Sequence, residues 1–497
     1  MKKILGKIFS RVVNKKELKW KQNPVEAQQN VFHNLINKGL TTQFGKDHHF
    51  KEIKTHADFV KNVPIRDYEK LKTYIDQTVE GKENVLWPGK PAYFAKTSGT
   101  TSGSKYIPIS KESMPFHIKS ARNALLNYIH EKGSANFVQG KMIFLQGSPI
   151  LEEVNGVKTG RLSGIVAHYV PSYLQSNRMP SWETNTIEEW ETKVDAIVEE
   201  TYQENMTLVS GIPPWIIMYF ERLQDKTSKK IGELFPNLEL IVTGGVNFEP
   251  YRQKMNDLIG REVEIIQTYP ASEGFIGYQD QLNQDDLLLL LNHGIFYEFV
   301  PVEEIHDENP TRLTIHQVAL DVNYVLIMST NAGLWAYNIG DTVKFTSLKP
   351  YRIVVSGRVK HYTSAFGEHV IGKEVENAMM HTNALFNIKV SEFHVAPQVN
   401  PIEGLPYHEW FIEFESLPDD LEAYRAELNK QMQAQNPYYD DLITGHILDM
   451  LHITKLEKNA FNDYMKSIGK LGGQFKLPRL ANDRKIADPL TSRKISD

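Results

Sequence analysis

The sequence has no cysteine among its 497 residues. This absence excludes disulfides, zinc–thiolate sites, iron–sulfur clusters and any thiol nucleophile, and it fits the cytoplasmic location that we predict. Long hydrophobic runs are absent as well. The longest aliphatic run spans only Leu287 to Leu291, far short of the roughly 18–20 apolar residues that cross a bilayer. We interpret this run as a buried strand.

An excess of positive charge is also missing, because 56 Lys and Arg stand against 61 Asp and Glu, a formal net charge of −5. We therefore predict no nucleic-acid partner, although a net value leaves room for a local basic patch. Hydrophobic residues make up 41% and charged residues 24%, as in ordinary folded proteins. At roughly 100–200 residues per domain, the length predicts two to four domains.

Positive charge is concentrated in residues 1–22. Basic and apolar residues alternate there at helical spacing: Lys2, Lys3, Lys7, Arg11, Lys15, Lys16, Lys19 and Lys21 with Leu5, Ile8, Phe9, Val12 and Val13. The apolar residues are scattered, unlike the continuous core of a signal peptide. Two interpretations remain, a helix on a membrane surface or a helix docked on its own domain with a solvated basic face. We favour the second, so membrane association through residues 1–22 is the less favoured alternative.

Apolar periodicity predicts alternating helices and strands. Helical patterns lie at Pro24–Lys38, Lys111–Lys132, Ile187–Asn205, Pro214–Asp225 and Pro250–Ile259. In the second of these, Ser110 can cap the helix, and the predicted apolar stripe is Met114, Ile118, Ala121, Leu125 and Ile129. Strand-like runs lie at Met142–Gln146, Thr207–Ser210, Leu238–Thr243, Val263–Thr268, Ile295–Val300, Arg312–Val318 and Tyr324–Ser329.

The order of these elements predicts an α/β fold. From Met142 to Thr268 strands and helices alternate, which favours a mainly parallel sheet flanked by helices. From Ile295 to Ser356 the strands follow one another quickly and are expected to be antiparallel. Three of the earlier strands end in small or polar residues near Gly211, Gly245 and Tyr269. Ligands bind outside the carboxyl ends of such strands, so these three ends predict one site.

A domain boundary is predicted at Gly357 and Arg358. Residues 1–357 then form a large domain and residues 358–497 a small α+β domain. Within the small domain the sequence predicts helices at Gly372–His381, Leu421–Gln435 and Lys458–Gly469, with short strands near His394 and Phe411. The last stretch, 480–497, is polar and is expected to be loosely held.

The most informative segment is Thr97-Ser-Gly-Thr-Thr-Ser-Gly-Ser-Lys105. Its glycines allow backbone N–H groups to converge on an anion, its hydroxyls add donors, and Lys105 adds positive charge, which together suit the phosphates of a nucleotide. The spacing is not that of a Walker A loop. A flexible surface turn is the alternative. The apolar run Tyr106–Ser110 follows directly and leads into a predicted helix, which argues against a flexible surface turn without a function.

This loop resembles the phosphate-binding signature of adenylate-forming enzymes, the superfamily of acyl-CoA ligases, luciferases and peptide synthetases. Within it the chain is most similar to the auxin-responsive promoter family of acyl-acid amido synthetases. Three further segments carry that likeness in the expected order: Tyr269-Pro-Ala-Ser-Glu273, Gly294-Ile-Phe-Tyr-Glu-Phe-Val-Pro301 and Leu334-Trp-Ala-Tyr-Asn-Ile-Gly-Asp341. Asn338 stands where the family usually has Arg, which puts the role of that Arg in doubt here.

The resemblance implies the adenylate-forming fold, with a large domain that combines parallel sheets and an antiparallel, barrel-like part, and a small mobile domain. It also implies a ligase that uses ATP and Mg²⁺ to adenylate a small carboxylic acid and then transfers the acyl group to an amine, with an amino acid as the favoured acceptor. An acyl-CoA or other thioester synthetase is the alternative with the same first step, and residues 294–301 favour the amide. A non-catalytic, nucleotide-binding module at a membrane is a third alternative, against which the retained Lys105, Glu273 and Asp341 argue. No obligate protein partner is indicated.

The resemblance also implies roles for single residues. The phosphates would be held by Ser98, Gly99, Thr100, Thr101, Gly103 and Lys105. Glu273 would bind Mg²⁺ and Asp341 the ribose, and the adenine slot would be formed by Gly244, Gly245 and Tyr269. Thr268 would also contact the nucleotide, and Ser272 would form a hydrogen bond with a phosphate or with the substrate. Arg358 would be the hinge, and Lys476 would reach the α-phosphate, with Lys470 as its rival. Each position also has a structural alternative, which for Tyr269 is a place in the core and for Arg358 a solvent-facing linker.

Histidine supplies no further site. None of the 17 His residues has the spacing of a metal motif, so no metal other than the nucleotide's Mg²⁺ is predicted. His168 and Tyr169 either line an acyl pocket or pack in the core, and the sequence does not distinguish these alternatives.

Overall fold

The computed structural model describes residues 2–495 apart from 99–103, 171–174, 189, 246–247, 360–361, 364–369, 400, 445–447, 471–476 and 482. The chain divides into two units, each described by itself below. The first comprises Met1–Ile339 and Val343–Val354, and the second comprises Gly340–Thr342 and Val355–Asp497. Within the described residues, no helix combines the length and the apolar character that crossing a membrane requires.

A large mixed sheet forms the centre of the first unit. Its strands among the described residues run in the order β12-β13-β14-β15-β11-β10-β9-β8-β7-β3-β6. Their bounds are β3 Lys141–Phe144, β6 Arg178–Met179, β7 Met206–Gly211, β8 Leu240–Gly244, β9 Glu264–Ala271, β10 Gly274–Tyr278, β11 Leu287–Leu289, β12 Ile295–Pro301, β13 Asn323–Thr330, β14 Tyr337–Leu348 and β15 Tyr351–Arg358. The pairs β3–β7, β7–β8 and β8–β9 are parallel, whereas β9–β10 and β12–β13 are antiparallel. The predicted α/β fold with a parallel and an antiparallel part is thereby confirmed.

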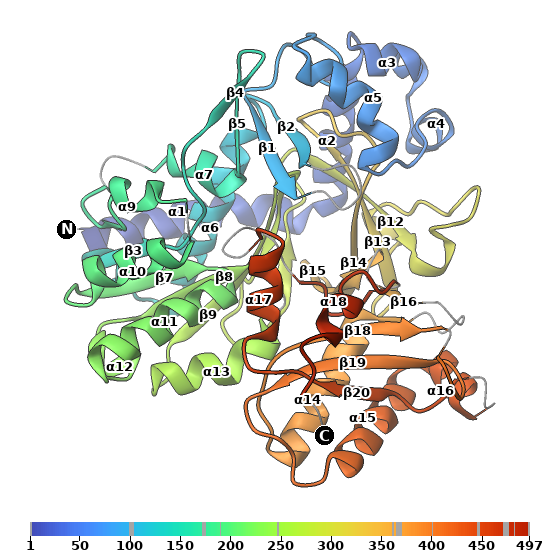
Figure 1. Cartoon of the computed structure of the whole chain (residues 1–497). Helices are drawn as coiled ribbons and strands as arrows, with labels where there is room; N and C mark the ends of the chain where they lie inside the picture. The colour runs from blue at the N-terminus through green and yellow to red at the C-terminus, as the bar shows by residue number, and fades with distance from the viewer. Residues whose placement is uncertain are drawn as a thin grey trace. The chain divides into compact units, whose positions relative to one another are not determined.

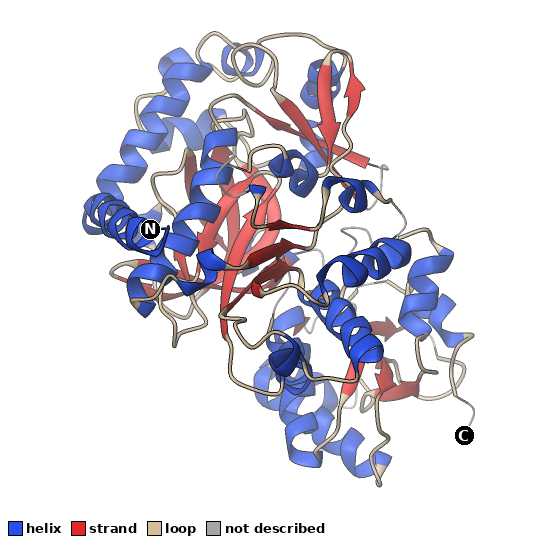
Figure 2. Ribbon diagram, turned by 90° about the vertical axis from the view of Figure 1, so that its left-hand side faces the viewer, coloured by secondary structure: helices blue, strands red, loops and turns tan. Residues whose placement is uncertain are grey.

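Helices cover both faces of the parallel strands. Those of the first unit are α1 Lys2–Gln22, α2 Pro24–Gly39, α3 Gln43–Asp47, α4 His56–Asn62, α5 Tyr68–Val79, α6 Met114–Lys132, α7 Leu162–Ala167, α9 Trp182–Thr186, α10 Trp190–Thr201, α11 Pro213–Thr227, α12 Ile231–Leu234 and α13 Glu249–Ile259. Short 3₁₀ turns occupy η1 Phe50–Glu52, η2 Asn136–Gln139, η3 Val302–Glu304 and η4 Ile315–Gln317. Figure 1 shows α11 and α13 beside β7–β9, and Figure 2 shows the strands as a layer between helices.

The two helical layers follow from the alternation of side chains along each strand. Leu208 and Leu240 pack with side chains of α1 and α6 on one face of the sheet. Their neighbours Val209 and Ile241 pack with α10, α11 and α13 on the other. Because both faces are covered, these strands carry apolar residues continuously rather than at every second position.

A second, smaller sheet in the first unit supports the predicted phosphate loop. It consists of β2 Ser104–Ile109, β1 Tyr93–Ser98, β5 Val157–Gly160 and β4 Glu152–Val154, in that order. The strands β1 and β2 are antiparallel and form the two arms that flank residues 99–103.

The second unit has its own three-stranded sheet and core. Its elements are β16 Tyr362–Thr363, β17 Val370–Ile371, α14 Gly372–Phe386, β18 Val390–Gln398, β19 Tyr407–Phe414, α15 Leu421–Gln435, α16 Pro437–Thr444, β20 His452–Lys455, α17 Ala460–Ser467 and α18 Ala487–Thr491. The strands β18 and β19 are antiparallel, and β20 is parallel to β19. Trp410 of β19 is fully buried in the core beneath α14 and α15. The unit has the α+β character expected of the small domain.

Three predictions about elements are wrong. Residues 312–318 do not form a strand, because after a single bridge at Leu313 the chain turns into η4, where Thr314 and Gln317 form a capping box. In α6 the predicted stripe is rotated, since Ala121 is exposed while His117, Ser120 and Ala124 are buried.

The third error concerns the end of the chain. We predicted that residues 480–497 are loosely held. Among those described, Leu480 and Leu490 are fully buried, and Ala481 donates a backbone hydrogen bond to Val395. This segment therefore belongs to the core of the second unit.

Candidate functional site

The predicted phosphate loop is held between β1 and β2. The two strands stay in register up to the pair Ser98 and Ser104. Gly99, Thr100, Thr101 and Gly103 lie outside the described residues, as does the side chain of Ser98. The paired strands therefore bring the two ends of this segment together at Ser98 and Ser104.

Lys105 follows the loop and lies beside an aromatic ring. Its Nζ atom is 5.3 Å from the centroid of the Tyr68 ring. Tyr68 begins α5, and its hydroxyl accepts a hydrogen bond of 3.0 Å from the backbone N–H of Tyr106. These contacts join the second arm of the hairpin to α5 and set the direction from which Lys105 leaves the strand.

The carboxyl ends of β8 and β9 meet closely at Gly244. Gly244 is paired with Thr268, and a Cβ atom at Gly244 would lie 2.5 Å from the Thr268 carbonyl oxygen and 2.6 Å from its hydroxyl. The Thr268 hydroxyl donates a hydrogen bond of 3.1 Å to the Thr243 carbonyl. Gly245 has φ +82°, a conformation that favours glycine. The backbone therefore favours glycine at both positions.

Glu273 lies in the two-residue turn between β9 and β10. The flanking residues Ala271 and Gly274 are paired, so Ser272 and Glu273 form the tip of a tight hairpin. The Glu273 carboxylate accepts a hydrogen bond from the hydroxyl of Tyr337, a buried residue at the start of β14. Burial, together with the charge of Glu273, raises the pKa of Tyr337 well above its ordinary value. The phenol therefore stays protonated and donates to the carboxylate.

These contacts bring together residues far apart in the sequence. The charges of Glu273 and Asp67 both act on Tyr337, and the Tyr68 hydroxyl acts on it as well. Lys105, through Tyr68, belongs to the same neighbourhood. The structure thus gathers the predicted residues Lys105 and Glu273 around two tyrosines that the sequence did not single out. Tyr337 lies inside the segment 334–341, which was a signal, whereas nothing in the sequence marked Tyr68.

Tyr269 lies in the core. Only 8% of its surface is exposed, and it packs in the cluster beneath β10–β13. This is the arrangement expected of a core tyrosine, and stacking on a base stays a prediction.

Asn338 is held by its backbone, whose N–H donates 2.8 Å to the Arg66 carbonyl. The Arg66 guanidinium is directed to His48, with 2.9 Å between Nη2 and Nε2.

The remaining predicted residues belong to the second unit. Asp341 lies in the segment Gly340–Thr342 of that unit. Arg358 is the last residue of β15, and its side chain is not among the described parts of the chain. Lys476 lies outside the described residues. Lys470 follows α17 and donates its backbone N–H to the Met465 carbonyl. The roles of these four residues stay predictions.

His168 and Tyr169 are exposed, so the alternative that they pack in the core is wrong. The ring of His168 makes a hydrogen bond of 2.9 Å through Nε2 to the Pro149 carbonyl, and the Tyr169 hydroxyl donates to the hydroxyl of Tyr93 at 2.9 Å. Among the described residues, no three His, Asp or Glu side chains converge as a metal site. A nucleotide-bound Mg²⁺ does not need one, since one or two carboxylates with phosphate oxygens suffice.

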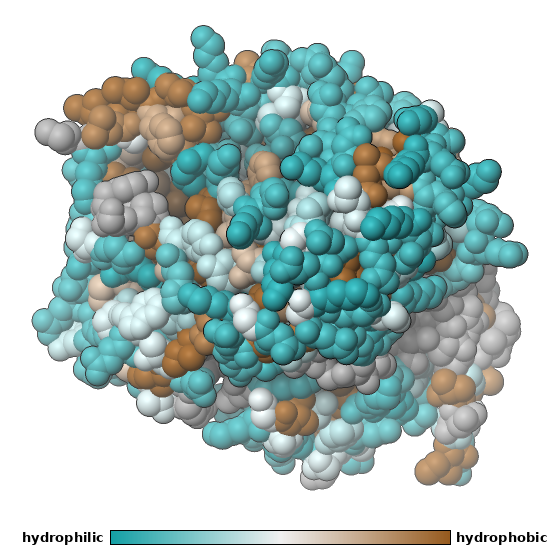
Figure 3. Space-filling model, turned by 90° about the horizontal axis from the view of Figure 1, so that it is seen from above, coloured by the Kyte–Doolittle hydropathy of each residue, from teal (hydrophilic) through white to brown (hydrophobic). Residues whose placement is uncertain are grey.

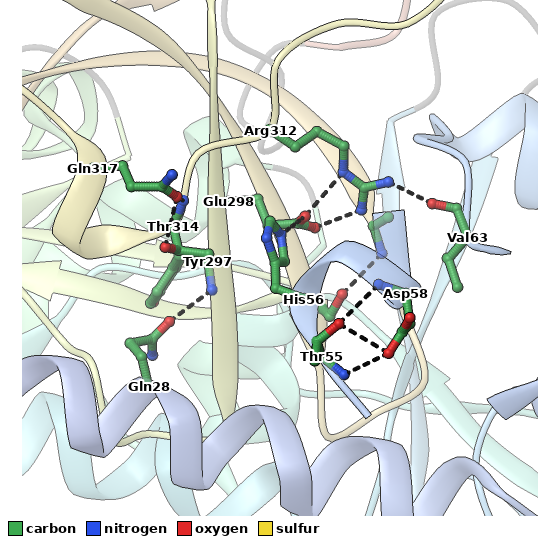
Figure 4. A network of polar contacts seen from close by, with 12 residues as sticks. Gln28, Thr55, His56, Asp58, Val63, Tyr297, Glu298, Arg312, Thr314 and Gln317 are labelled. Atoms are coloured by element: carbon green, nitrogen blue, oxygen red, sulfur yellow. Dashed lines mark hydrogen bonds and ion pairs between the residues drawn. The ribbon is translucent and has the colours of Figure 1, made fainter. Parts of the chain in front are cut away.

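The segment 294–301 has a structural role that its sequence did not reveal. It forms β12, and every residue from Ile295 to Val300 is buried. Glu298 accepts hydrogen bonds from Arg312, at 2.9 and 2.7 Å, and pairs with His56 at 2.7 Å (Figure 4). Burial opposes the charge of Glu298, but Arg312 and His56 keep its pKa below the ordinary value. In this structure the segment therefore builds the core.

Family comparisons cover most of the chain. Models of the GH3 family match it in three consecutive parts: the N-terminal domain at residues 15–187 and 152–264, the central domain at 288–358 and the C-terminal domain at 373–485. A curated relative, jasmonoyl–L-amino acid synthetase JAR4 of Nicotiana attenuata, is 22% identical over 361 residues. That alignment spans 59% of this chain and 61% of the relative.

Solved structures extend the likeness of fold over almost the whole chain. A structure of GH3.15 acyl acid amido synthetase matches with a TM-score of 0.81 at 16% identity, covering 99% of this chain and 97% of the other. A 2-hydroxyisobutyryl-CoA ligase in complex with its acyl-AMP matches with a TM-score of 0.62 at 12% identity, covering 94% and 92%. At such identities the comparison concerns the fold alone.

Proposed function

The chain belongs to the GH3 family, and from this premise we propose that it is an ATP-dependent acyl-acid amido synthetase. It activates a carboxylic acid as an acyl adenylate and transfers the acyl group to an amine, preferably that of an amino acid. The observation that carries the proposal is the neighbourhood of Lys105 and Glu273, which are 168 residues apart in the sequence yet share the tyrosine pair Tyr68 and Tyr337. This neighbourhood contains a cation, which can bind phosphate, and a carboxylate, which can bind Mg²⁺, and ATP·Mg²⁺ needs both.

In the first step a carboxylate oxygen of the acid attacks the α-phosphorus of ATP. The new P–O bond forms, the α–β anhydride bond breaks, and pyrophosphate leaves. Both reactants are anions, so the chain must supply fixed donors and positive charge. Backbone N–H groups and hydroxyls of residues 98–103 bind the β- and γ-phosphates, Lys105 adds charge there, and Lys476 of the second unit binds the α-phosphate.

Glu273 fits Mg²⁺, because its carboxylate is an oxygen ligand at the tip of a rigid hairpin and is oriented by a neutral donor, Tyr337. When bound, Mg²⁺ neutralises the charge that develops on the departing phosphates. Gly244 and Gly245 leave room for the base at the edge of the sheet, and Asp341 accepts from the ribose hydroxyls.

In the second step the amine nitrogen attacks the acyl carbon. The C–N bond forms, the C–O bond to AMP breaks, and the amine loses a proton. Positioning of the two substrates supplies most of the rate, without a covalent intermediate on the protein. Arg358 acts as the hinge about which the small domain turns between the steps.

The direct experiment is a screen of AMP release over carboxylic acids crossed with amines. We expect AMP only when acid and ATP are both present, at a rate that an amino acid increases. Stimulation by coenzyme A in place of an amino acid would assign the thioester synthetase instead. ATP binding without AMP from any acid would favour a non-catalytic nucleotide-binding module. Replacing Lys476 by Ala should abolish pyrophosphate release, whereas loss only in Lys470→Ala would transfer the role to Lys470.

Tyr337 tests the metal part of the proposal. Tyr337→Phe removes the hydroxyl that orients Glu273, so the Mg²⁺ concentration for half-maximal pyrophosphate release should rise about tenfold, while Glu273→Gln should abolish the Mg²⁺ response. A matched control is Tyr74→Phe, which also removes a hydroxyl that donates to a carboxylate, that of Asp47 at 2.9 Å. Equal Mg²⁺ dependence in both tyrosine variants would contradict the positioning role.

A further inference from the structure

The first helix carries an apolar stripe that faces solvent. The five residues of this stripe are Ile4, Leu5, Ile8, Phe9 and Val12, whose exposed fractions are 65%, 58%, 54%, 44% and 47%. Figure 3 shows a continuous apolar patch at the upper left, at the amino-terminal end of the chain. At 100° per residue, these positions fall within an arc of about 140° on one side of α1. Isolated exposed apolar residues are ordinary, but a contiguous stripe marks an interaction surface.

The opposite side of α1 is docked on the first unit. Ser10, Val13 and Trp20 are buried, and a Cβ atom at Gly6 would contact Ile129 and Ala135 at 3.7 Å. The helix therefore uses a different side for its own domain. The docked helix that we favoured from the sequence is therefore confirmed, but of the five apolar residues named there only Val13 is buried.

Positive charge surrounds the stripe. Six basic residues of α1 have exposed side chains: Lys2, Lys7, Arg11, Lys15, Lys16 and Lys19. No acidic residue precedes Glu17 in the sequence. Helical geometry places Lys15, Lys16 and Lys19 on the side of the stripe, beyond Val12, and places Lys2, Lys7 and Arg11 along its margins.

We propose that α1 binds, parallel to the surface, to a bilayer that contains anionic phospholipids. The apolar stripe enters the boundary between headgroups and acyl chains, and the lysine side chains extend to the lipid phosphates. Charge favours lipid over a second copy of this chain, since two such faces brought together would oppose one basic cluster to another. Each Lys or Arg near an anionic surface contributes attraction that falls with ionic strength. Because the stripe lies opposite the docked side, binding requires no unfolding of α1.

Flotation of the full chain with lipid vesicles tests the proposal. We expect binding to vesicles of phosphatidylcholine with phosphatidylglycerol, little binding to pure phosphatidylcholine, and loss of binding in high salt. The double variant Leu5→Glu/Ile8→Glu should weaken binding at least tenfold. The matched control Leu385→Glu/Leu417→Glu places the same charges at side chains that are 67% and 54% exposed in the second unit, and should bind as the original chain does.

Two further measurements keep the outcome clear. The melting temperature of Leu5→Glu/Ile8→Glu should match that of the original chain, since both residues are more than half exposed. Its AMP release should be unchanged, because neither residue belongs to the proposed nucleotide site. Absence of binding to anionic vesicles, or equal binding to both vesicle types, would overturn the proposal. Self-association of the original chain that is lost in the double variant, without vesicle binding, would assign the stripe to a second copy instead.

Discussion

At the scale of single residues, Gly244 should tolerate no side chain. An added Cβ atom would lie 2.5 Å from the Thr268 carbonyl oxygen, which is backbone and cannot rotate away. We expect Gly244→Ala to lower the free energy of unfolding by about 1–3 kcal/mol, as overpacking does, and to weaken ATP binding. Urea denaturation and nucleotide titration measure the two effects. The control is Gly6→Ala, whose Cβ atom would meet only ordinary contacts at 3.7 Å, and equal effects in both variants would contradict this account.

Buried histidines should make the protein sensitive to acid. Burial lowers the pKa of His117 to about 4, and that of His293 and His394 also to about 4. Above about pH 6.5 these histidines are neutral in both folded and unfolded chains, so they add no pH dependence. As the pH falls from about 6.5 to 4 the unfolded chain takes up protons that the folded chain cannot, and stability is lost by up to about 1.4 kcal/mol per pH unit for each histidine.

One variant separates this effect from general acid denaturation. His117→Leu removes one titrating group, so its plot of unfolding free energy against pH should be less steep between pH 4 and 6.5. His130→Gln alters an exposed histidine on the same helix and should keep the original slope. Indistinguishable slopes for all three chains would show that His117 does not contribute.

Sequence motifs identified the residues of the candidate site, but they did not identify the side chains that contact those residues. Lys105 and Glu273 were found because each lies in a recognisable segment, and Gly244 because glycine at a strand end suggests close approach. Their partners were not found, since Tyr68 lies 37 residues before Lys105 and Tyr337 lies 64 residues after Glu273, separations that only the folded sheet bridges. The sequence also does not distinguish a tyrosine that packs in the core from one that stacks on a base, so it left both alternatives open for Tyr269.

At the scale of elements, the ion pair of β12 should be costly to break. Arg312→Met leaves the fully buried Glu298 without its main partner, and we expect a loss of about 3–5 kcal/mol in the free energy of unfolding. Glu298→Gln combined with Arg312→Met removes the buried charge and should recover much of that loss. Lys72→Met breaks an exposed pair with Asp76 that water screens, so it should leave the free energy of unfolding nearly unchanged. Similar losses in Arg312→Met and Lys72→Met would contradict the account.

Elements were predictable where apolar residues alone determine burial. The strands β7, β8 and β9 and the helix α11 lie close to their predicted positions for this reason. In α6 burial follows polar partners instead, because the Ser120 hydroxyl meets His293 at 3.1 Å and the Asn127 amide donates 2.8 Å to the Asp280 carbonyl. Those partners lie far along the chain, so no local period indicates the buried face.

At the scale of the whole molecule, the sequence predicted two domains. It did not predict which distant segments of the chain belong to the second domain. Motif order placed a boundary at Gly357, and the structure divides the chain near Val354 while assigning Gly340–Thr342 to the second unit. That short segment and the end of β15 are joined by a hydrogen bond of 2.9 Å between the hydroxyls of Ser356 and Thr342. Composition did not reveal the buried tail either, because its two leucines are embedded in a polar stretch.

The prediction at this scale tests the hinge proposed at Arg358 through the preceding residue, Gly357. A Cβ atom at Gly357 would lie 3.5 Å from the Thr342 hydroxyl, an ordinary contact, so Gly357→Ala should leave the melting temperature and both half-reactions nearly unchanged. Gly357→Pro fixes φ near −65° and restricts rotation of the backbone. If the small domain turns here between the two steps, single-turnover assays should show acid-dependent pyrophosphate release retained and amide formation slowed at least tenfold. Amide formation that keeps pace with pyrophosphate release in Gly357→Pro, at an unchanged melting temperature, would place the hinge elsewhere in the chain.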